Sequence, residues 1–185
     1  MRRKNLTSEM MMSYIAEALV LLMQQKPYSE ITIGEITKKA GVNRSTYYRH
    51  FESKENIILF YFDSIMNEYL NRFLSKQNTD FREYMLTMFE TFYTHKDALL
   101  AIHREGLSIL LLDVLMKYFN FSEIEMSAPP IQQFTASYHL GGIYNNMLLW
   151  FSHAMKETPK EMTRIALSFR PQQSLTLFRA CLKTQ

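Results

Sequence analysis

The pattern of this 185-residue sequence indicates an all-α protein. Apolar residues recur with the helical period of about 3.6 along nearly the whole chain. Only five Gly and five Pro occur, whereas β-sandwiches and barrels need many tight turns. Thirteen Met, 13 Phe and 11 Tyr supply the large, adaptable apolar interior that packed helices form.

The first two helices are marked by an apolar stripe and by a capping signal. The stripe of the first helix consists of Tyr14, Ile15, Ala18, Leu19 and Leu22. This helix should end before Pro27, because proline disfavours helical backbone at the residue that precedes it. Thr32 and Glu35 form a capping box, in which the hydroxyl caps an early amide and the carboxylate reaches back. A second, short helix should run from there to about Ala40.

Three further signals predict a turn and two more helices. Gly41 supplies the positive φ that a sharp turn needs. Asn43 is a good N-cap for a third helix that ends near Phe51, and Ser53 caps a fourth. Apolar doublets repeat every fourth residue along the fourth helix, from 57/58 to 73/74, so it should be roughly 35 Å long at 1.5 Å per residue.

The rest of the chain is also expected to be helical. Residues 76–80 form a polar linker, and residues 122–130, with Pro129-Pro130, should be the longest loop. Further helices are expected at residues 81–92, 99–119, 131–155 and 159–182. Pro159 suits a first helical turn, whereas Pro171 should kink or break the last helix.

The net charge of +3 lies entirely in the first third of the chain. Residues 1–60 hold nine Lys or Arg and six Asp or Glu, whereas residues 61–185 hold 12 of each. A basic module on a neutral body indicates an acidic polymer as partner.

Cysteine usage and hydropathy predict a protein of a reducing cytoplasm. Cys181 is the single cysteine, so it forms no internal disulfide or metal-binding pair, and we expect a small packing residue. Glu17 interrupts the apolar part of the N-terminal segment, so no signal peptide is expected. The longest strictly apolar run, residues 57–62, is too short to span a bilayer. We expect no membrane association, no metal and no cofactor, because no metal-ligand, phosphate-loop or dinucleotide motif occurs.

Residues 31–55 combine a short helix, a glycine-containing turn and a second short helix rich in Arg, Tyr and His. A helix-turn-helix needs this order, because one helix braces the second, which presents its N-terminal part to the DNA major groove. The core between the two helices should consist of Ile33, Ile36, Ala40, Val42, Tyr47 and Phe51. The outward face of the second helix should carry groups that bind guanine edges or phosphates: Arg44, Ser45, Tyr48 and Arg49. The helix starts at Thr32 and Lys54 offer amides to phosphate.

Two alternative interpretations are open at this stage. Residues 31–55 could be a surface hairpin whose basic residues are only solvated, but the capping, turn and core signals agree on a helix-turn-helix. Arg2-Arg3-Lys4 are either a frayed terminus or an arm that touches phosphate or the minor groove.

The same segment resembles the DNA-binding region of the TetR family of bacterial transcriptional regulators. The resemblance covers about 50 residues and rests on residues 31–36, Ala40-Gly41-Val42, residues 45–51 and Ser53-Lys54-Glu55. It implies a three-helix DNA-binding domain at residues 1–55, joined by a long helix to an effector-binding and dimerisation domain at residues 56–185. It implies DNA-facing positions for Thr32, Arg44, Ser45, Thr46, Tyr48, Arg49, His50 and Lys54. Many members have Tyr or His where this chain has Arg49, so the base that Arg49 favours is open.

The resemblance further implies a ligand-responsive repressor that acts as a homodimer on a palindromic operator, in the bacterial cytoplasm and on the nucleoid when bound to DNA. The apolar bulk of the body indicates an apolar or aromatic small-molecule effector. Candidate effector-binding residues are Met88, Phe89, Phe92, His103, Met116, Tyr144 and Asn145. Candidate dimer-interface residues are Gly141, Gly142, Met147, Leu148, Phe151, Leu175 and Phe178. Ordinary core is the alternative role for both sets.

Two other classes of function compete with this prediction. A TetR-like coactivator or adaptor would bind a protein partner rather than DNA, but it would not need the basic face of residues 44–50. An α-helical enzyme is not expected, because no acid–base or nucleophile set is recognisable.

Overall fold

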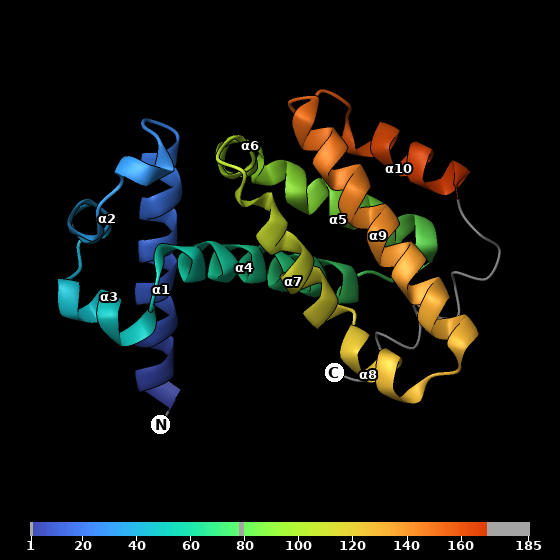
Figure 1. Ribbon diagram of the computed structural model, residues 1–185, viewed down its shortest axis with the longest axis horizontal. Coiled ribbons are helices and arrows are strands. Elements are labelled where there is room, and N and C mark those ends of the chain that lie inside the picture. The colour runs from blue at the N-terminus through green and yellow to red at the C-terminus, as the bar shows by residue number, and fades with distance from the viewer. Residues whose placement is uncertain (1, 78–79, 170–185) are drawn as a thin grey trace. The chain divides into compact units, whose positions relative to one another are not determined.

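The computed structural model describes the backbone of residues 2–77 and 80–169, and the side chains from residue 8 onward within those ranges. Every regular element in them is a helix (Figure 1), which confirms the all-α prediction for this part of the chain. The elements, with η for a 3₁₀ helix, are α1 (Arg2–Met23), η1 (Tyr28–Glu30), α2 (Ile33–Ala40), α3 (Arg44–His50), α4 (Lys54–Leu74), α5 (Phe81–Thr94), α6 (Lys96–Arg104), η2 (Leu107–Ile109), α7 (Leu110–Tyr118), α8 (Phe121–Ser127), α9 (Pro130–Ser152) and α10 (Pro159–Ser168).

The first of two compact units consists of residues 1–64 and 97–110. In it α1 packs against α2 and α3 (Figure 1). Ile15, Ala18 and Leu19 of the predicted stripe are buried, whereas Tyr14 is exposed. The helix ends at Met23, ahead of Pro27 as predicted.

Residues 97–110 belong to this first unit although they lie far along the chain. The Arg104 guanidinium donates a hydrogen bond to the carbonyl of Met23 at 2.7 Å. The carboxylate of Glu105 accepts one from the backbone N–H of Tyr28 at 3.1 Å. These two contacts hold the C-terminal end of α6 against the segment that joins α1 to η1.

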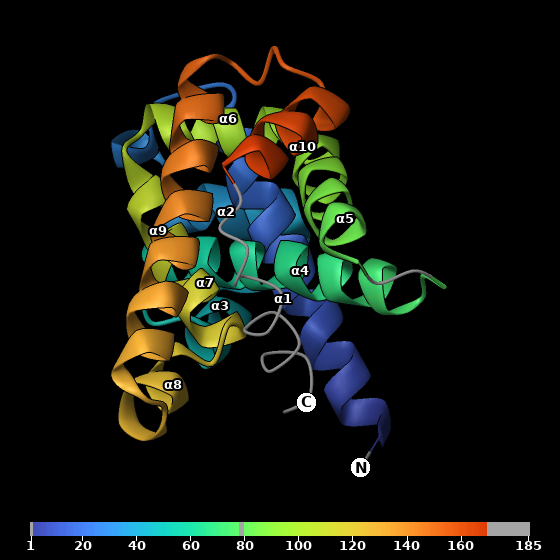
Figure 2. The ribbon, with the colours of Figure 1, turned by 90° about the vertical axis from the view of Figure 1, so that its right-hand side faces the viewer.

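The second unit consists of residues 65–96 and the chain from residue 111 onward. Its α5 and α10 pack against each other (Figure 2). Trp150 of α9 is almost fully buried, with its ring edge-on to Phe89 and stacked on Tyr93. Its indole N–H donates to the carbonyl of Glu157 at 3.0 Å, so the polar atom of this large core side chain is satisfied.

Two predicted elements of the second half are wrong. The single helix expected at residues 99–119 is divided into α6, η2 and α7, because Gly106 adopts the left-handed conformation with φ 74°. The loop expected at 122–130 is mostly α8, whose first turn is closed by N–H bonds from Glu123 and Ile124 to the carbonyl of Asn120. Only its last residues, before Pro129, are extended.

The last helix begins as predicted. Thr158 and Glu161 form a capping box at its start, and Pro159 occupies its first turn. The kink predicted at Pro171, the predicted end near residue 182, and Cys181 lie outside the described residues.

Tyr69 of α4 has a buried hydroxyl with no hydrogen-bond partner among the described residues. The side chain is 2% exposed, and its ring lies against Phe73 and Tyr84. Burial raises the pKa of this phenol well above its usual range. A buried hydroxyl that has left water without finding a partner costs on the order of 1–3 kcal/mol.

We therefore expect Tyr69→Phe to raise the free energy of unfolding by about 1 kcal/mol, because it removes the unpaired hydroxyl and keeps the ring. Urea denaturation of both chains measures the difference. The matched control is Tyr84→Phe, which removes a hydroxyl that lies 3.4 Å from the imidazole Nε2 of His139 and should give no gain. A less stable Tyr69→Phe chain would contradict this account.

Candidate functional site

The turn between α2 and α3 has the geometry that the sequence predicts. Gly41 adopts the left-handed conformation with φ 69°, and the N–H of Val42 donates to the carbonyl of Thr37 at 3.0 Å. Tyr47 and Phe51 of the predicted core are buried, with ring centroids 6.1 Å apart. Ile36 is also buried, so the two helices share one small core.

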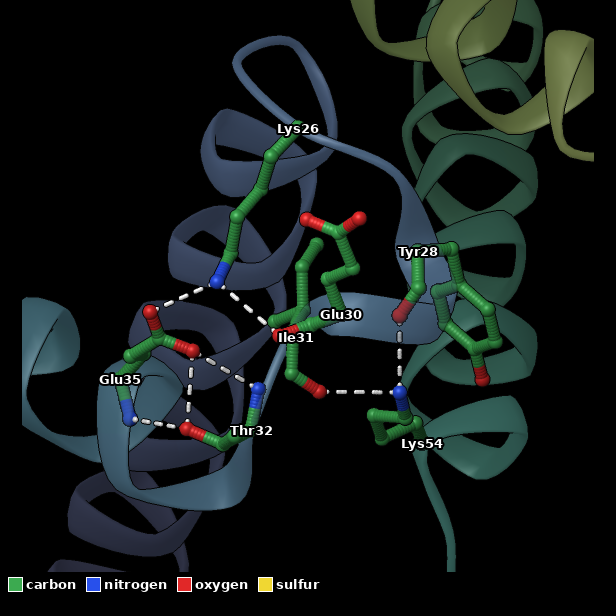
Figure 3. Close-up of polar contacts among 7 residues, drawn as sticks. All are labelled: Lys26, Tyr28, Glu30, Ile31, Thr32, Glu35 and Lys54. Atoms are coloured by element: carbon green, nitrogen blue, oxygen red, sulfur yellow. Dashed lines mark hydrogen bonds and ion pairs between the residues drawn. The ribbon is translucent and has the colours of Figure 1, made fainter.

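A capping box starts α2, as predicted (Figure 3). The Thr32 hydroxyl accepts from the N–H of Glu35 at 3.3 Å, and the Glu35 carboxylate accepts from the N–H of Thr32 at 2.9 Å. Lys26 adds an ion pair to the same carboxylate at 2.6 Å. The Lys26 hydrogen bond, followed by those from Thr32, lowers the pKa of Glu35 to about 2. Because the folded-state pKa is depressed, this contribution to stability is present at neutral pH and is lost as pH falls towards 2.

Helix α3 presents most of the predicted DNA-facing side chains to solvent. Arg44, Ser45, Tyr48 and Arg49 are exposed, whereas Thr46 and His50 are half-buried. Asn43 occupies the N-cap position, but its side chain makes no capping bond, unlike the prediction. Its backbone carbonyl accepts from the N–H of Thr46 instead, at 2.9 Å.

Lys54 has a structural use that the sequence did not indicate (Figure 3). Its amine donates to the carbonyls of Tyr28 and Ile31, each at 2.9 Å, and lies 4.2 Å from the centre of the Tyr28 ring. An ammonium group has three donors, so one N–H is left for a phosphate. Lys54 therefore ties the start of α4 to the segment that leads into α2. The predicted Ser53 cap is present, since its hydroxyl accepts from the N–H of Asn56 at 3.2 Å.

The Arg44 side chain lies against Gly34 of α2, a contact that was not predicted from the sequence. A Cβ added at Gly34 would lie 2.6 Å from Nη2 of Arg44. The guanidinium therefore lies directly against the backbone of α2, where any other residue would displace it. The available signal was a glycine inside a short helix where no turn requires one.

A cavity of about 550 Å³ lies within the second unit, between α5, α9 and α10. Its larger lining side chains are Phe81, Met85, Tyr138, His139, Ile143 and Phe169. Asn145, one of the candidate effector residues, lines it. The other predicted effector residues do not: Met88, Phe89, Phe92 and Tyr144 are buried elsewhere in the core, Met116 is exposed, and His103 belongs to the first unit, where it bonds to Ser108.

The candidate dimer-interface residues lie in several different environments. Met147 and Phe151 are buried inside their own chain and are not available to a second copy. Leu148 is half-buried, and Leu175 and Phe178 lie outside the described residues. A Cβ at Gly141 or Gly142 would meet nothing within 4 Å, and both glycines line the cavity.

The outward face of α9 carries exposed apolar residues that were not predicted from the sequence as a contact surface. Ile131, Phe134, Tyr138 and Leu149 are 66%, 75%, 70% and 56% exposed. Their spacing of i, i+3, i+7 and i+18 places them on one side of a helix. We call these four residues the α9 stripe.

Metal-binding clusters and membrane-spanning helices are both absent from the described residues. No group of three or more His, Cys, Asp or Glu side chains there could hold a metal ion. None of the helices described is both long enough and apolar enough to cross a membrane.

Comparison with protein families identifies the N-terminal segment. Residues 15–59 match the model of the bacterial regulatory proteins of the tetR family. These residues contain the end of α1, the capping box, the glycine turn, α3 and the start of α4. The chain carries a TetR-family domain.

Relatives of this chain include the uncharacterised HTH-type transcriptional regulator YuxN of Bacillus subtilis, which is 26% identical over 71% of the chain and 44% of YuxN. The HTH-type transcriptional regulator EthR of Mycobacterium tuberculosis is 30% identical over 46% of the chain and 41% of EthR. The matches thus span less than half the length of these curated relatives.

A solved structure extends the TetR-family likeness to the whole fold. The crystal structure of a tetR-family transcriptional regulator from Streptomyces coelicolor matches 94% of this chain and 92% of that one, with a TM-score of 0.50 and 15% identity. At that identity the match concerns the fold alone: an N-terminal helix-turn-helix with a helical body.

Proposed function

We propose that the protein is a DNA-binding transcriptional regulator in which α3 enters the major groove. The observation that carries the proposal is the composition of the exposed face of α3. Arg44, Ser45, Tyr48 and Arg49 face solvent there, while Tyr47 and Phe51 anchor the helix to its small core. Arginine binds guanine edges or phosphates, and hydroxyls bind phosphates or base edges.

Thr32, Thr46, His50 and the remaining N–H of Lys54 complete the proposed DNA contacts. Thr32 and Lys54 flank the two helix starts, at α2 and α4, where backbone N–H groups and the helix dipole favour a phosphate. Thr46 and His50 lie on α3 beside the exposed face. We expect these four to fix register and to contribute affinity rather than sequence discrimination.

The regulator acts, in this proposal, as a homodimer. The α9 stripe supports it, because four large apolar side chains in a row are costly to leave in water. A helix face of this kind packs well against its own copy across a two-fold axis. Two recognition helices about 34–36 Å apart would then bind a palindromic operator. A chain mass of one protomer in light scattering at micromolar concentration would contradict the dimer.

Effector binding to the body completes the proposal of a ligand-responsive repressor. An effector that favours a conformation unable to span both half-sites lowers operator affinity by the coupling free energy, typically about 1–3 kcal/mol. The cavity of the second unit provides a volume of ordinary size for a small ligand.

The deciding experiment is selection of bound sequences from a random DNA pool at two salt concentrations. We expect a palindromic motif whose affinity falls steeply with salt, because phosphate contacts release counterions. Recovery of no motif, with only weak salt-sensitive binding, would contradict sequence-specific binding and favour the adaptor alternative.

Gly34→Ala is expected to lower operator affinity about threefold to tenfold. This loss corresponds to part of the free energy, about 1–3 kcal/mol, that a bidentate arginine contact with a base supplies. The new methyl group would displace the Arg44 guanidinium from its position against α2. Stability should not fall, since alanine is a better helix former than glycine. Fluorescence anisotropy with a labelled operator measures the affinity. Equal operator affinity of Gly34→Ala and wild type would exclude this role of Gly34.

A further inference from the structure

We infer that the cavity between α5, α9 and α10 binds an uncharged, flat aromatic molecule that carries a hydroxyl group. This inference rests on the proposed regulatory function only for its consequence at the operator, because binding itself is a property of the second unit. The cavity measures about 550 Å³, within the range of about 300–1,000 Å³ typical of sites for small ligands.

The walls of the cavity indicate an uncharged occupant. None of the described residues that line it is Asp, Glu, Lys or Arg. His139 is among the lining residues, and burial lowers the pKa of its imidazole to about 4. The imidazole is therefore neutral at physiological pH. A charged ligand would lose its hydration here without gaining an opposite charge.

Aromatic side chains form part of the cavity wall. The rings of Phe81 and His139 lie 5.8 Å apart, and the ring of Tyr84 stacks on His139 at 6.1 Å. The Tyr84 hydroxyl lies 3.4 Å from Nε2 of His139, which helps to hold the imidazole in place. Flat ring faces held in this way favour a flat aromatic ligand, which stacks on them or meets them edge-on.

The polar groups of the wall can bond to a hydroxyl group on the ligand. The Thr135 hydroxyl already donates to the carbonyl of Ile131 at 2.6 Å, and its oxygen can still accept a hydrogen bond. The Asn145 amide donates one N–H to the carbonyl of Gly141 at 2.8 Å and keeps a second N–H and its oxygen. A ligand hydroxyl, which both donates and accepts, would bond to these groups.

Gly141 and Gly142 keep the cavity open. Both line it, and a Cβ at either would project into empty space. Glycine in the middle of a helix costs about 0.5–1 kcal/mol relative to alanine. Two adjacent glycines in α9 therefore lower the stability of the helix without any packing gain among the described residues. Room for a ligand accounts for both positions.

The cavity also adjoins the α9 stripe, since Tyr138 belongs to both. An occupant that contacts Tyr138 thus touches the surface on which we place the second copy. Binding would then change how the two copies meet, which is the route by which the effector would act on the operator.

The test is a fluorescence titration of the full chain with three matched probes: 1-hydroxypyrene, pyrene and pyrene-1-carboxylate. We expect 1-hydroxypyrene to bind at least about tenfold more tightly than either of the others, since pyrene lacks a hydrogen-bonding group and pyrene-1-carboxylate carries a charge. Gly141→Leu and Ala166→Leu fill the cavity from two different helices and should each abolish binding. Gln132→Leu places a leucine at an exposed position of α9 outside the cavity and should leave binding unchanged.

Equal binding of the three probes, or unchanged binding to Gly141→Leu and Ala166→Leu, would overturn the inference. Circular dichroism and the operator affinity of the ligand-free variants show that the chains are folded and active. The two proposals fail separately. If Gly141→Leu and Ala166→Leu lose probe binding but keep their operator affinity, the result supports the cavity as the binding site. If the wild-type chain binds the probe but selects no operator, only the regulatory function is refuted.

Discussion

Tyr47→Ala is expected to lower the free energy of unfolding by about 3–5 kcal/mol, which is the usual cost of removing a large buried aromatic side chain. The variant should also lose operator binding. Tyr47 is 1% exposed, and its ring lies between those of Tyr48, at 5.1 Å, and Phe51, at 6.1 Å. It is the main side chain by which the seven-residue α3 is anchored. Such a short helix has little stability without its packing, so the whole recognition element should become disordered. Urea denaturation and operator titration measure the two effects.

The neighbouring Tyr48→Ala is the matched control. Tyr48 is 65% exposed, so its removal should change stability by no more than about 0.5 kcal/mol. Operator affinity should nevertheless fall, because the lost hydroxyl is one of the proposed DNA contacts. Loss of stability in both variants would show that α3 is held differently, and unchanged operator affinity of Tyr48→Ala would remove Tyr48 from the proposed contacts.

The N-terminal half of the fold was predictable because its signals are local. A capping box spans four residues, and a glycine at positive φ determines its own turn, so Thr32, Glu35 and Gly41 could be interpreted without knowing any distant contact. The same logic applied to Gly106 would have divided the helix expected at residues 99–119. There the apolar period of the flanking residues outweighed the glycine in our prediction, and the prediction was wrong.

The sites in the helical body could not be predicted, because they depend on which helices cross. His103 and His139 look alike in sequence, yet the first bonds to Ser108 in the first unit and the second lines the cavity. Periodicity placed Met147 and Phe151 on an apolar face of their helix. It does not distinguish a face that packs inside the chain from one that contacts a second copy. Nor could it show that Gly34 and Arg44, which are ten residues apart in the sequence, are in contact.

The contribution of Arg44 to the operator complex should be the largest of any exposed residue on α3. A bidentate arginine contact supplies about 1–3 kcal/mol of discrimination. In the proposed homodimer each substitution is present in both half-sites, so Arg44→Ala should cost about 2–6 kcal/mol, at least about 30-fold in affinity. Stability should be unchanged, because the side chain is exposed. Titration of wild type and variant with the same labelled operator measures the loss.

Arg44→Lys separates the two ways in which this residue can bind DNA. Lysine keeps the positive charge but lacks the rigid fork that matches a guanine edge. If Arg44 reads a base, Arg44→Lys should keep the salt dependence of wild type and still lose most of the affinity and the preference at one operator position. Wild-type affinity in Arg44→Lys would instead make Arg44 a phosphate contact. Gly34→Ala would then also have little effect, because a flexible cation reaches a phosphate from several positions, whereas a base edge requires a defined position of the guanidinium.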